Sequence, residues 1–198
     1  SGAMQTGWLS KGGSWYWLDP DSGAMATGWE KASDGKWYYF EGSGAMRSGG
    51  WMKQGSSWYY LSGSGAMQTG WLSKGGSWYW LDPDSGAMAT GWEKASDGKW
   101  YYFEGSGAMQ SSRWLKQGTA WYYLSGSGAM QTGWLLTGGA WYWMDPESGM
   151  MATGWLENGG SWYYLDPSSG AMATGTAVID GTRYIFDDSG ACADFVDE

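Results

Sequence analysis

The chain contains no histidine and a single cysteine, Cys192, so an internal disulfide is excluded. Without histidine, and with no clustered carboxylates outside turn positions, general acid–base and nucleophilic chemistry have few candidates. We therefore expect no enzyme activity, no catalytic residue, no metal site and no cofactor in this chain. We interpret Cys192 as a small apolar residue at a position where the other repeats carry Met.

Aliphatic residues and long apolar runs are also scarce. Apolar burial must come from the 19 Trp and 14 Tyr, whose rings each bury a large area but are poor at filling one central core. No stretch of eighteen apolar residues occurs, so we expect no membrane insertion, and the start lacks the pattern of a signal peptide. Residues 1–4 match the tail of a repeat, residues 64–67, so we expect the protein to extend further toward its N-terminus, or this chain to be an excised fragment.

Basic residues are outnumbered, with 11 Lys and Arg against 20 Asp and Glu and a net charge of −9. Nucleic-acid binding depends on Lys and Arg that neutralise phosphates, so the charge argues against a nucleic-acid partner despite the many rings. An acidic balance mildly favours a cationic ligand, although a solvated surface that keeps the protein soluble is the preferred explanation.

What the chain does have is a ladder of Trp residues at steps of 21, 22, 20, 21, 22, 20 and 21 residues, each followed by a second Trp seven or eight positions later. Residues 1–63 laid over residues 64–126 differ at only six positions, so three short repeats form a 63-residue super-repeat. Units of this length cannot bury their own apolar face and must stack on their neighbours. The ladder consists of Trp8, Trp29, Trp51, Trp71, Trp92, Trp114, Trp134 and Trp155.

Each repeat is predicted to form a β-hairpin. In the second repeat a short strand around Trp29 leads to Asp34-Gly35, a strong hairpin-turn signal, and residues 37–40 form the return strand. Because neighbouring strand residues point to opposite sides, Trp37 and Tyr39 lie on one face, and Tyr38 and Phe40 lie on the other. The sequence therefore predicts an all-β fold of nine tandem hairpins without helices.

The ninth unit departs from this pattern. Thr176, Arg183 and Ile185 replace its first Trp, its second Trp and its third ring, whereas Tyr184 and Phe186 keep the opposite face. We therefore divide the chain into eight regular hairpin repeats, residues 1–175, and an atypical capping hairpin with an acidic tail, residues 176–198. Because a hairpin forms without the ladder rings, we interpret those rings as serving a ligand.

We expect the two Trp of one hairpin and the third ring of the next to converge, for instance Trp8, Trp15 and Tyr39. Three rings would form an electron-rich box that attracts a quaternary ammonium through cation–π contacts of up to about 2 kcal/mol. Two alternatives stay open: the rings only hold consecutive hairpins together, or they stack on a carbohydrate, which usually also needs polar partners for its hydroxyls.

Several phrases carry a family resemblance: Gly7-Trp8, Trp15-Tyr16-Trp17-Leu18-Asp19, the run from Ser22 to Trp29, and Trp162-Tyr163-Tyr164-Leu165-Asp166. They resemble the choline-binding repeats of Gram-positive surface proteins. The resemblance implies a left-handed β-solenoid with about three hairpins per superhelical turn and choline held between consecutive hairpins. It also implies a secreted module at the bacterial cell surface that binds phosphocholine of teichoic and lipoteichoic acids beside a separate effector or lytic domain.

The resemblance assigns each choline two Trp, one further ring and a Met-like fourth wall. Because Trp80 and Trp143 are larger than the usual Tyr, we expect their sites to be altered or closed, and Ile185 makes an eighth site doubtful. The matched sets are Trp8/Trp15/Tyr39, Trp29/Trp37/Tyr60, Trp51/Trp58/Trp80, Trp71/Trp78/Tyr102, Trp92/Trp100/Tyr123, Trp114/Trp121/Trp143 and Trp134/Trp141/Tyr164, with Met46, Met67, Met109 and Met130 as fourth walls.

Other functions remain open at this point. The stretch Trp37-Tyr38-Tyr39-Phe40 also resembles the repeats of glucan-binding arrays. A structural spacer or dimerising arm would use the rings only for packing, and the C-terminal hairpin with Cys192 is a candidate contact for a homodimer.

Overall fold

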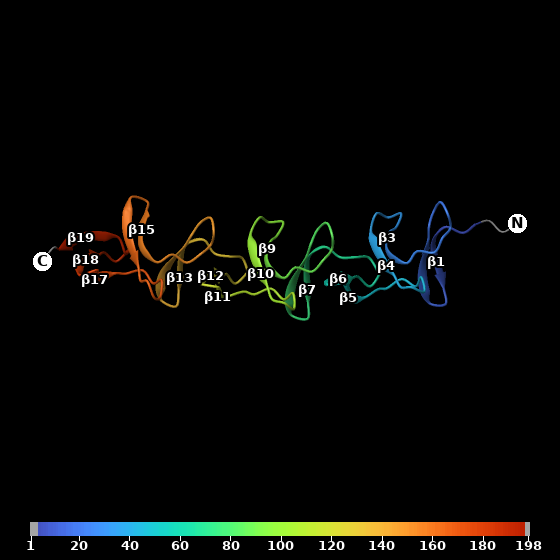
Figure 1. The fold of residues 1–198 in the computed structure, drawn as a ribbon, viewed down its shortest axis with the longest axis horizontal. Coiled ribbons are helices and arrows are strands. Elements are labelled where there is room, and N and C mark those ends of the chain that lie inside the picture. The colour runs from blue at the N-terminus through green and yellow to red at the C-terminus, as the bar shows by residue number, and fades with distance from the viewer. Residues whose placement is uncertain (1–3, 197–198) are drawn as a thin grey trace. The chain divides into compact units, whose positions relative to one another are not determined.

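The structure is a computed structural model that describes residues 4–196 (Figure 1). Within this range the chain forms strands only, paired as nine antiparallel hairpins, the last of which gains a third strand. The predicted all-β array of tandem hairpins is confirmed. The strands are β1 Gly7–Lys11, β2 Ser14–Leu18, β3 Gly28–Lys31, β4 Trp37–Phe40, β5 Gly50–Gln54, β6 Ser57–Leu61, β7 Gly70–Lys74, β8 Ser77–Leu81, β9 Gly91–Lys94, β10 Trp100–Phe103, β11 Arg113–Gln117, β12 Ala120–Leu124, β13 Gly133–Thr137, β14 Ala140–Met144, β15 Gly154–Asn158, β16 Ser161–Leu165, β17 Gly175–Ile179, β18 Thr182–Phe186 and β19 Cys192–Val196.

The turns follow from glycine placement. β1 and β2 pair from Gly7↔Leu18 to Lys11↔Ser14, which leaves a two-residue turn at Gly12-Gly13. Both turn glycines have positive φ, 60° and 80°, the backbone that a two-residue hairpin turn requires at both positions. The second hairpin has a longer loop, in which Gly35, at φ 78°, donates its N–H to the carbonyl of Ala32.

Every hairpin has two different faces. In the first hairpin the register pairs Trp8 with Trp17 and Ser10 with Trp15, so these side chains share one side, which we call the ladder face. The other side, the opposite face, carries Tyr38 and Phe40 in the second hairpin, and these two residues are buried. Hairpins stack head to tail, because the Trp8 ring lies 4.8 Å from the Tyr38 ring of the next hairpin.

After each hairpin a tail crosses to the next one. Met46, which follows the second hairpin, bridges Phe40 of its own hairpin and donates its N–H to the Trp15 carbonyl of the first (2.7 Å). Its side chain covers the tail of the third hairpin, where a Cβ on Gly65 would lie 2.6 Å from the Met46 sulfur. A side chain at Gly65 would be strained by its φ of 88°, and it would also displace the end of the Met46 side chain.

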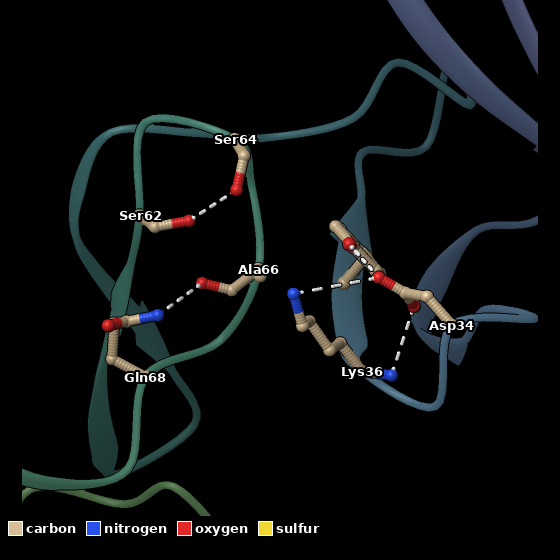
Figure 2. Close-up of polar contacts among 7 residues, drawn as sticks. Asp34, Lys36, Ser62, Ser64, Ala66 and Gln68 are labelled. Carbon is tan, nitrogen blue, oxygen red and sulfur yellow. Dashed lines mark hydrogen bonds and ion pairs between the residues drawn. The ribbon is translucent and has the colours of Figure 1, made fainter.

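Two kinds of turn shape these tails. In one kind an Asp accepts hydrogen bonds from a Ser, as Asp166 does from the Ser168 and Ser169 hydroxyls, and these bonds lower the pKa of Asp166 to about 2. In the other kind two Ser hydroxyls meet, as Ser62 and Ser64 do at 2.8 Å (Figure 2). Both turns have side-chain hydrogen bonds of their own, so the tail geometry is set locally.

The tails keep a stricter period than the ladder. The tail Met residues recur every 21 residues from Met4 to Met172, whereas the ladder steps vary between 20 and 22. The third hairpin of each super-repeat absorbs the difference with one extra residue before its ladder Trp, Gly49 in the first copy and Ser112 in the second. Both donate their N–H to a carbonyl of the tail that follows their own hairpin (2.8 Å), and both have positive φ.

The chain forms two compact units. Unit 1 extends to Gly98 and includes Tyr102–Met109, and unit 2 comprises Lys99–Tyr101 and the residues from Gln110 onward. Unit 2 contains the three-stranded terminal sheet, in which β18 lies between β17 and β19. The sequence-based boundary at residue 175 stays a prediction.

Ser112 provides a test of this geometry. Its φ is 54°, which glycine adopts freely but an L-residue adopts at a cost of about 1–2 kcal/mol. We expect Ser112→Gly to raise the free energy of unfolding by about 1 kcal/mol, since the entropy cost of glycine offsets part of the relief. Urea denaturation followed by Trp fluorescence measures the change. The reverse substitution in the first copy, Gly49→Ser, should lower stability by a similar amount, and equal midpoints for all three chains would contradict the argument.

Candidate ligand-binding site

Three rings converge at the seam between the first two hairpins. The ladder-face residues Trp8 and Trp15 meet edge to face, with ring centroids 6.2 Å apart, and Tyr38 approaches Trp8 from the second hairpin at 4.8 Å. These rings and Met46 line a hollow of about 470 Å³, with Ser48, Gly63 and Ser64 at its rim. We call such a set of two ladder-face Trp, one opposite-face Tyr and one tail Met a box.

The third seam has a box of the same construction. Trp51 and Trp58 belong to the third hairpin, Tyr79 to the fourth, and Met88 to the tail after it. They line a hollow of about 300 Å³, whose rim includes Ser106 from the tail after the fifth hairpin. Each box thus combines residues of three successive repeats.

At the first and third seams the ring that lines the hollow is not the predicted one, whereas the choline-binding role of the seven sets stays a prediction. At the first seam Tyr39 does not join Trp8 and Trp15; it lies against Trp29, the ladder Trp of its own hairpin (5.4 Å), with which it is in register. Each of the others likewise contacts the ladder Trp of its own hairpin: Tyr60 meets Trp51, Trp80 meets Trp71, Tyr102 meets Trp92, Tyr123 meets Trp114, Trp143 meets Trp134 and Tyr164 meets Trp155.

The error has a simple physical reason. Trp37 and Tyr39 do share a face, but in a head-to-tail stack the ladder face of one hairpin meets the opposite face of the next. The ring that completes a seam is therefore one residue earlier in the chain, because neighbouring strand residues point to opposite sides. The rings found against the preceding ladder Trp are Tyr38, Tyr59, Tyr79, Tyr142, Tyr163 and Tyr184.

Two sites were expected to be altered or closed because their third ring was a Trp, and this expectation no longer applies when the third ring is Tyr. Trp80 is almost fully buried beside Trp71, and Trp143 packs on Trp134 at 5.1 Å, so neither ring enlarges a box. The rings present at those seams are Tyr79 and Tyr142. A signal for them was available in the sequence: the residue after the second Trp is Tyr in all eight regular repeats, whereas the next residue varies between Trp and Tyr.

The second Trp of each hairpin, which we call the outer Trp, is largely exposed. Trp15 and Trp78 are 48% exposed, and the other outer Trp residues, Trp37, Trp58, Trp100, Trp121, Trp141 and Trp162, lie between 37% and 49%. Rings that served only to hold hairpins together would be covered by them. A row of exposed Trp faces beside hollows is instead typical of a binding surface.

The boxes offer ring faces, with few polar groups. Tyr38 stays neutral, because burial and its hydrogen bond to Asp34 (2.8 Å) raise the pKa of its hydroxyl to about 12. A hydrogen bond from the Lys36 N–H, and after it the one from Tyr38, lowers the pKa of Asp34, and Figure 2 shows that turn. A neutral cage of Trp and Tyr faces attracts cations that carry no hydrogen-bond donors.

The predicted fourth walls occupy equivalent places. Met46 lines the first hollow, and Met88, which the sequence-based sets omitted, lines that of the third seam. Met67 and Met130 cover the glycine of the following tail, Gly86 and Gly149, and Met109 donates its N–H to the Trp78 carbonyl. The tail Met residues therefore pack the seam as well as line a box.

Between residues 4 and 196, no group of three or more His, Cys, Asp or Glu side chains is placed to hold a metal ion. In the same range there is no helix of the length and apolarity needed to cross a bilayer.

Known structures resemble this fold closely. The choline-binding domain of CbpL from Streptococcus pneumoniae is 30% identical, with 98% of this chain and 100% of that chain covered and a TM-score of 0.70. CbpJ of the same species is 31% identical over 96% of this chain and 88% of that chain, at a TM-score of 0.67. The pneumococcal modular autolysin LytC is 31% identical at a TM-score of 0.60, and the alignment covers 97% of this chain but only 47% of LytC.

Profiles of two sequence families also match this chain and agree with the structural comparison. The choline-binding repeat profile matches residues 48–91, 86–114, 115–153 and 147–176, and a cell wall binding repeat profile matches residues 6–25 and 27–46. A comparison with curated protein sequences found no match. Together with the repeated boxes, these matches show that the chain belongs to the choline-binding repeat family.

Proposed function

We propose that this chain attaches a surface protein non-covalently to the bacterial cell wall by binding the choline of teichoic and lipoteichoic acids. The observation that carries the proposal is the box: an exposed outer Trp beside a Tyr and a Met at the first seam and again at the third. In this proposal the chain itself is not catalytic.

The box suits the chemistry of choline. A trimethylammonium group is bulky, cationic and unable to donate a hydrogen bond, so it is best held by ring faces and a polarisable thioether. The phosphate would point to the rim, where the first box presents the hydroxyls of Ser48 and Ser64. A partly open box binds weakly, because much of the ligand stays in water.

Weak boxes in series are effective on a polymer that displays many cholines. After the first box engages, each further contact is intramolecular, and avidity exceeds single-site affinity by orders of magnitude. Repetition of one simple site therefore achieves attachment without a tight individual site.

The proposal extends to location and partners. A cell-wall module acts outside the cell, and we propose that it is secreted and works beside a lytic or effector domain, as its similarity to one part of the autolysin LytC suggests.

We also propose a homodimer through the C-terminal hairpin. Light scattering should then give twice the chain mass of 21.6 kDa, and a monomer at micromolar concentration would contradict the dimer.

Affinity chromatography tests the proposed ligand. We expect retention on a diethylaminoethanol-type resin at a salt concentration that abolishes ordinary ion exchange, and elution by free choline. A glucan-binding array would instead be retained on dextran, and a structural spacer on neither resin. Retention on dextran without elution by choline would contradict our assignment.

Single substitutions test the geometry of the first box. Trp15→Ala should lower choline stoichiometry in equilibrium dialysis by one without unfolding the chain, because about half of that ring is already exposed. Tyr38→Leu should also remove one site, since the ring that completes this box is lost.

Tyr39→Leu is the matched control, because Tyr39 lies in the same strand but contacts Trp29 of its own hairpin. It should keep the site of the first seam. Far-UV circular dichroism must show that all three variants are folded. Loss of one site with Tyr39→Leu but not with Tyr38→Leu would restore the sequence-based assignment and overturn the structural one.

A further inference from the structure

The seam between the eighth hairpin and the terminal hairpin has the rings of a box. Trp155 and Trp162 lie 6.4 Å apart, and Tyr184 of the terminal hairpin lies 4.8 Å from Trp155. The corresponding distances at the first seam are 6.2 and 4.8 Å. Trp162 is 49% exposed, like the outer Trp of the first box, so its face is open to a ligand.

The atypical residues of the terminal hairpin do not disturb this seam. Ile185 is in register with Thr176, so both lie on the ladder face, which is directed away from Trp155. The face that meets Trp155 has kept both of its rings, since Phe186 also approaches Trp155, at 5.9 Å. The terminal hairpin lacks the ladder-face rings that a ninth site would need, but it retains the two opposite-face rings that meet Trp155 and complete an eighth site.

Cys192 takes the position of the tail Met. It is in register with Phe186, as Met46 is with Phe40, and its strand β19 lies against β16, the strand that carries Trp162.

Charge distinguishes this seam from the others. In each of seven hairpins the strand register pairs the outer Trp with one residue of the partner strand. From the first of these hairpins to the last, the paired residues are Ser10, Lys31, Lys53, Ser73, Lys116, Leu136 and Glu157. Lys53 and Lys116 hold their own ammonium groups over the outer ring, at 5.9 and 5.4 Å from its centroid, where they repel a second cation. Glu157, the only carboxylate of these seven, stands opposite Trp162 and attracts one.

We infer that the eighth seam is a further quaternary-ammonium box, formed by Trp155, Trp162 and Tyr184, in which the negative charge of Glu157 adds to the attraction for the cation. This inference rests on the proposed function, because it assigns the same ligand class to a seam that the sequence pattern left doubtful. It also identifies the position opposite the outer Trp as the one that tunes each box.

The single thiol reports on this box alone. We expect choline to slow alkylation of Cys192 by iodoacetamide, because a ligand between Trp162 and Tyr184 would cover the position of the tail Met. Trp162→Ala should abolish this protection and lower the choline stoichiometry in equilibrium dialysis by one. A fall in stoichiometry without any protection would support the box but overturn the placement of Cys192 in it.

Glu157→Gln tests the role of charge. At low ionic strength it should raise the choline concentration that gives half-maximal protection about threefold, the usual size of an exposed charge pair. In 1 M salt the difference should vanish, because screening then acts within about 3 Å. Asp21→Asn is the matched control: Asp21 is an exposed carboxylate that lines neither described hollow, and this variant should behave like the unaltered chain.

The outcomes separate the two proposals. If the chain binds no choline at all, the proposed function fails. If it binds choline but Trp162→Ala changes neither stoichiometry nor alkylation, only the eighth box is overturned. An unchanged midpoint in Glu157→Gln, with protection intact, would leave the box and overturn the role of its carboxylate.

Discussion

Head-to-tail contact between the two unlike faces of successive hairpins is the constraint on which the rest of this structure depends. A single hairpin exposes aromatic rings on both sides and has no core of its own. Burial of Phe40 and Tyr38 therefore requires Trp8 of the preceding hairpin, and the same relation recurs between Phe186 and Trp155. Because this contact joins a ladder face to an opposite face, the first and third seams each form a box between two hairpins.

The tails make this contact regular. In six tails the Met backbone hydrogen-bonds to the preceding hairpin and the Met side chain covers a glycine of the next tail. These are the tails of Met46, Met67, Met88, Met130, Met151 and Met172. The backbone positions are thus fixed every 21 residues, and length differences between hairpins are absorbed at Gly49 and Ser112. The irregular ladder of Trp residues is therefore compatible with a regular series of boxes.

The boxes use rings that the stack cannot cover completely. The ladder Trp packs against rings of its own hairpin and of the next one, although Trp155 remains 38% exposed. The outer Trp keeps about half of its surface in water, as Trp15 and Trp162 do. The residue opposite it, Lys116 in one hairpin and Glu157 in another, varies without disturbing the packing. Affinity can therefore differ from box to box while the fold stays the same.

The sequence by itself determined the repeat, the hairpins and their turns, because the spacing of Trp29, the pair Asp34-Gly35 and the alternation of residues 37–40 are local signals. It also indicated that two Trp and a further ring bind a ligand. Only the tertiary structure decided that this ring is Tyr38 rather than Tyr39, and that Tyr184 completes the eighth seam. Alternation shows which residues of a strand share a face, but the face that meets the next hairpin is set by stacking, which joins residues about thirty positions apart.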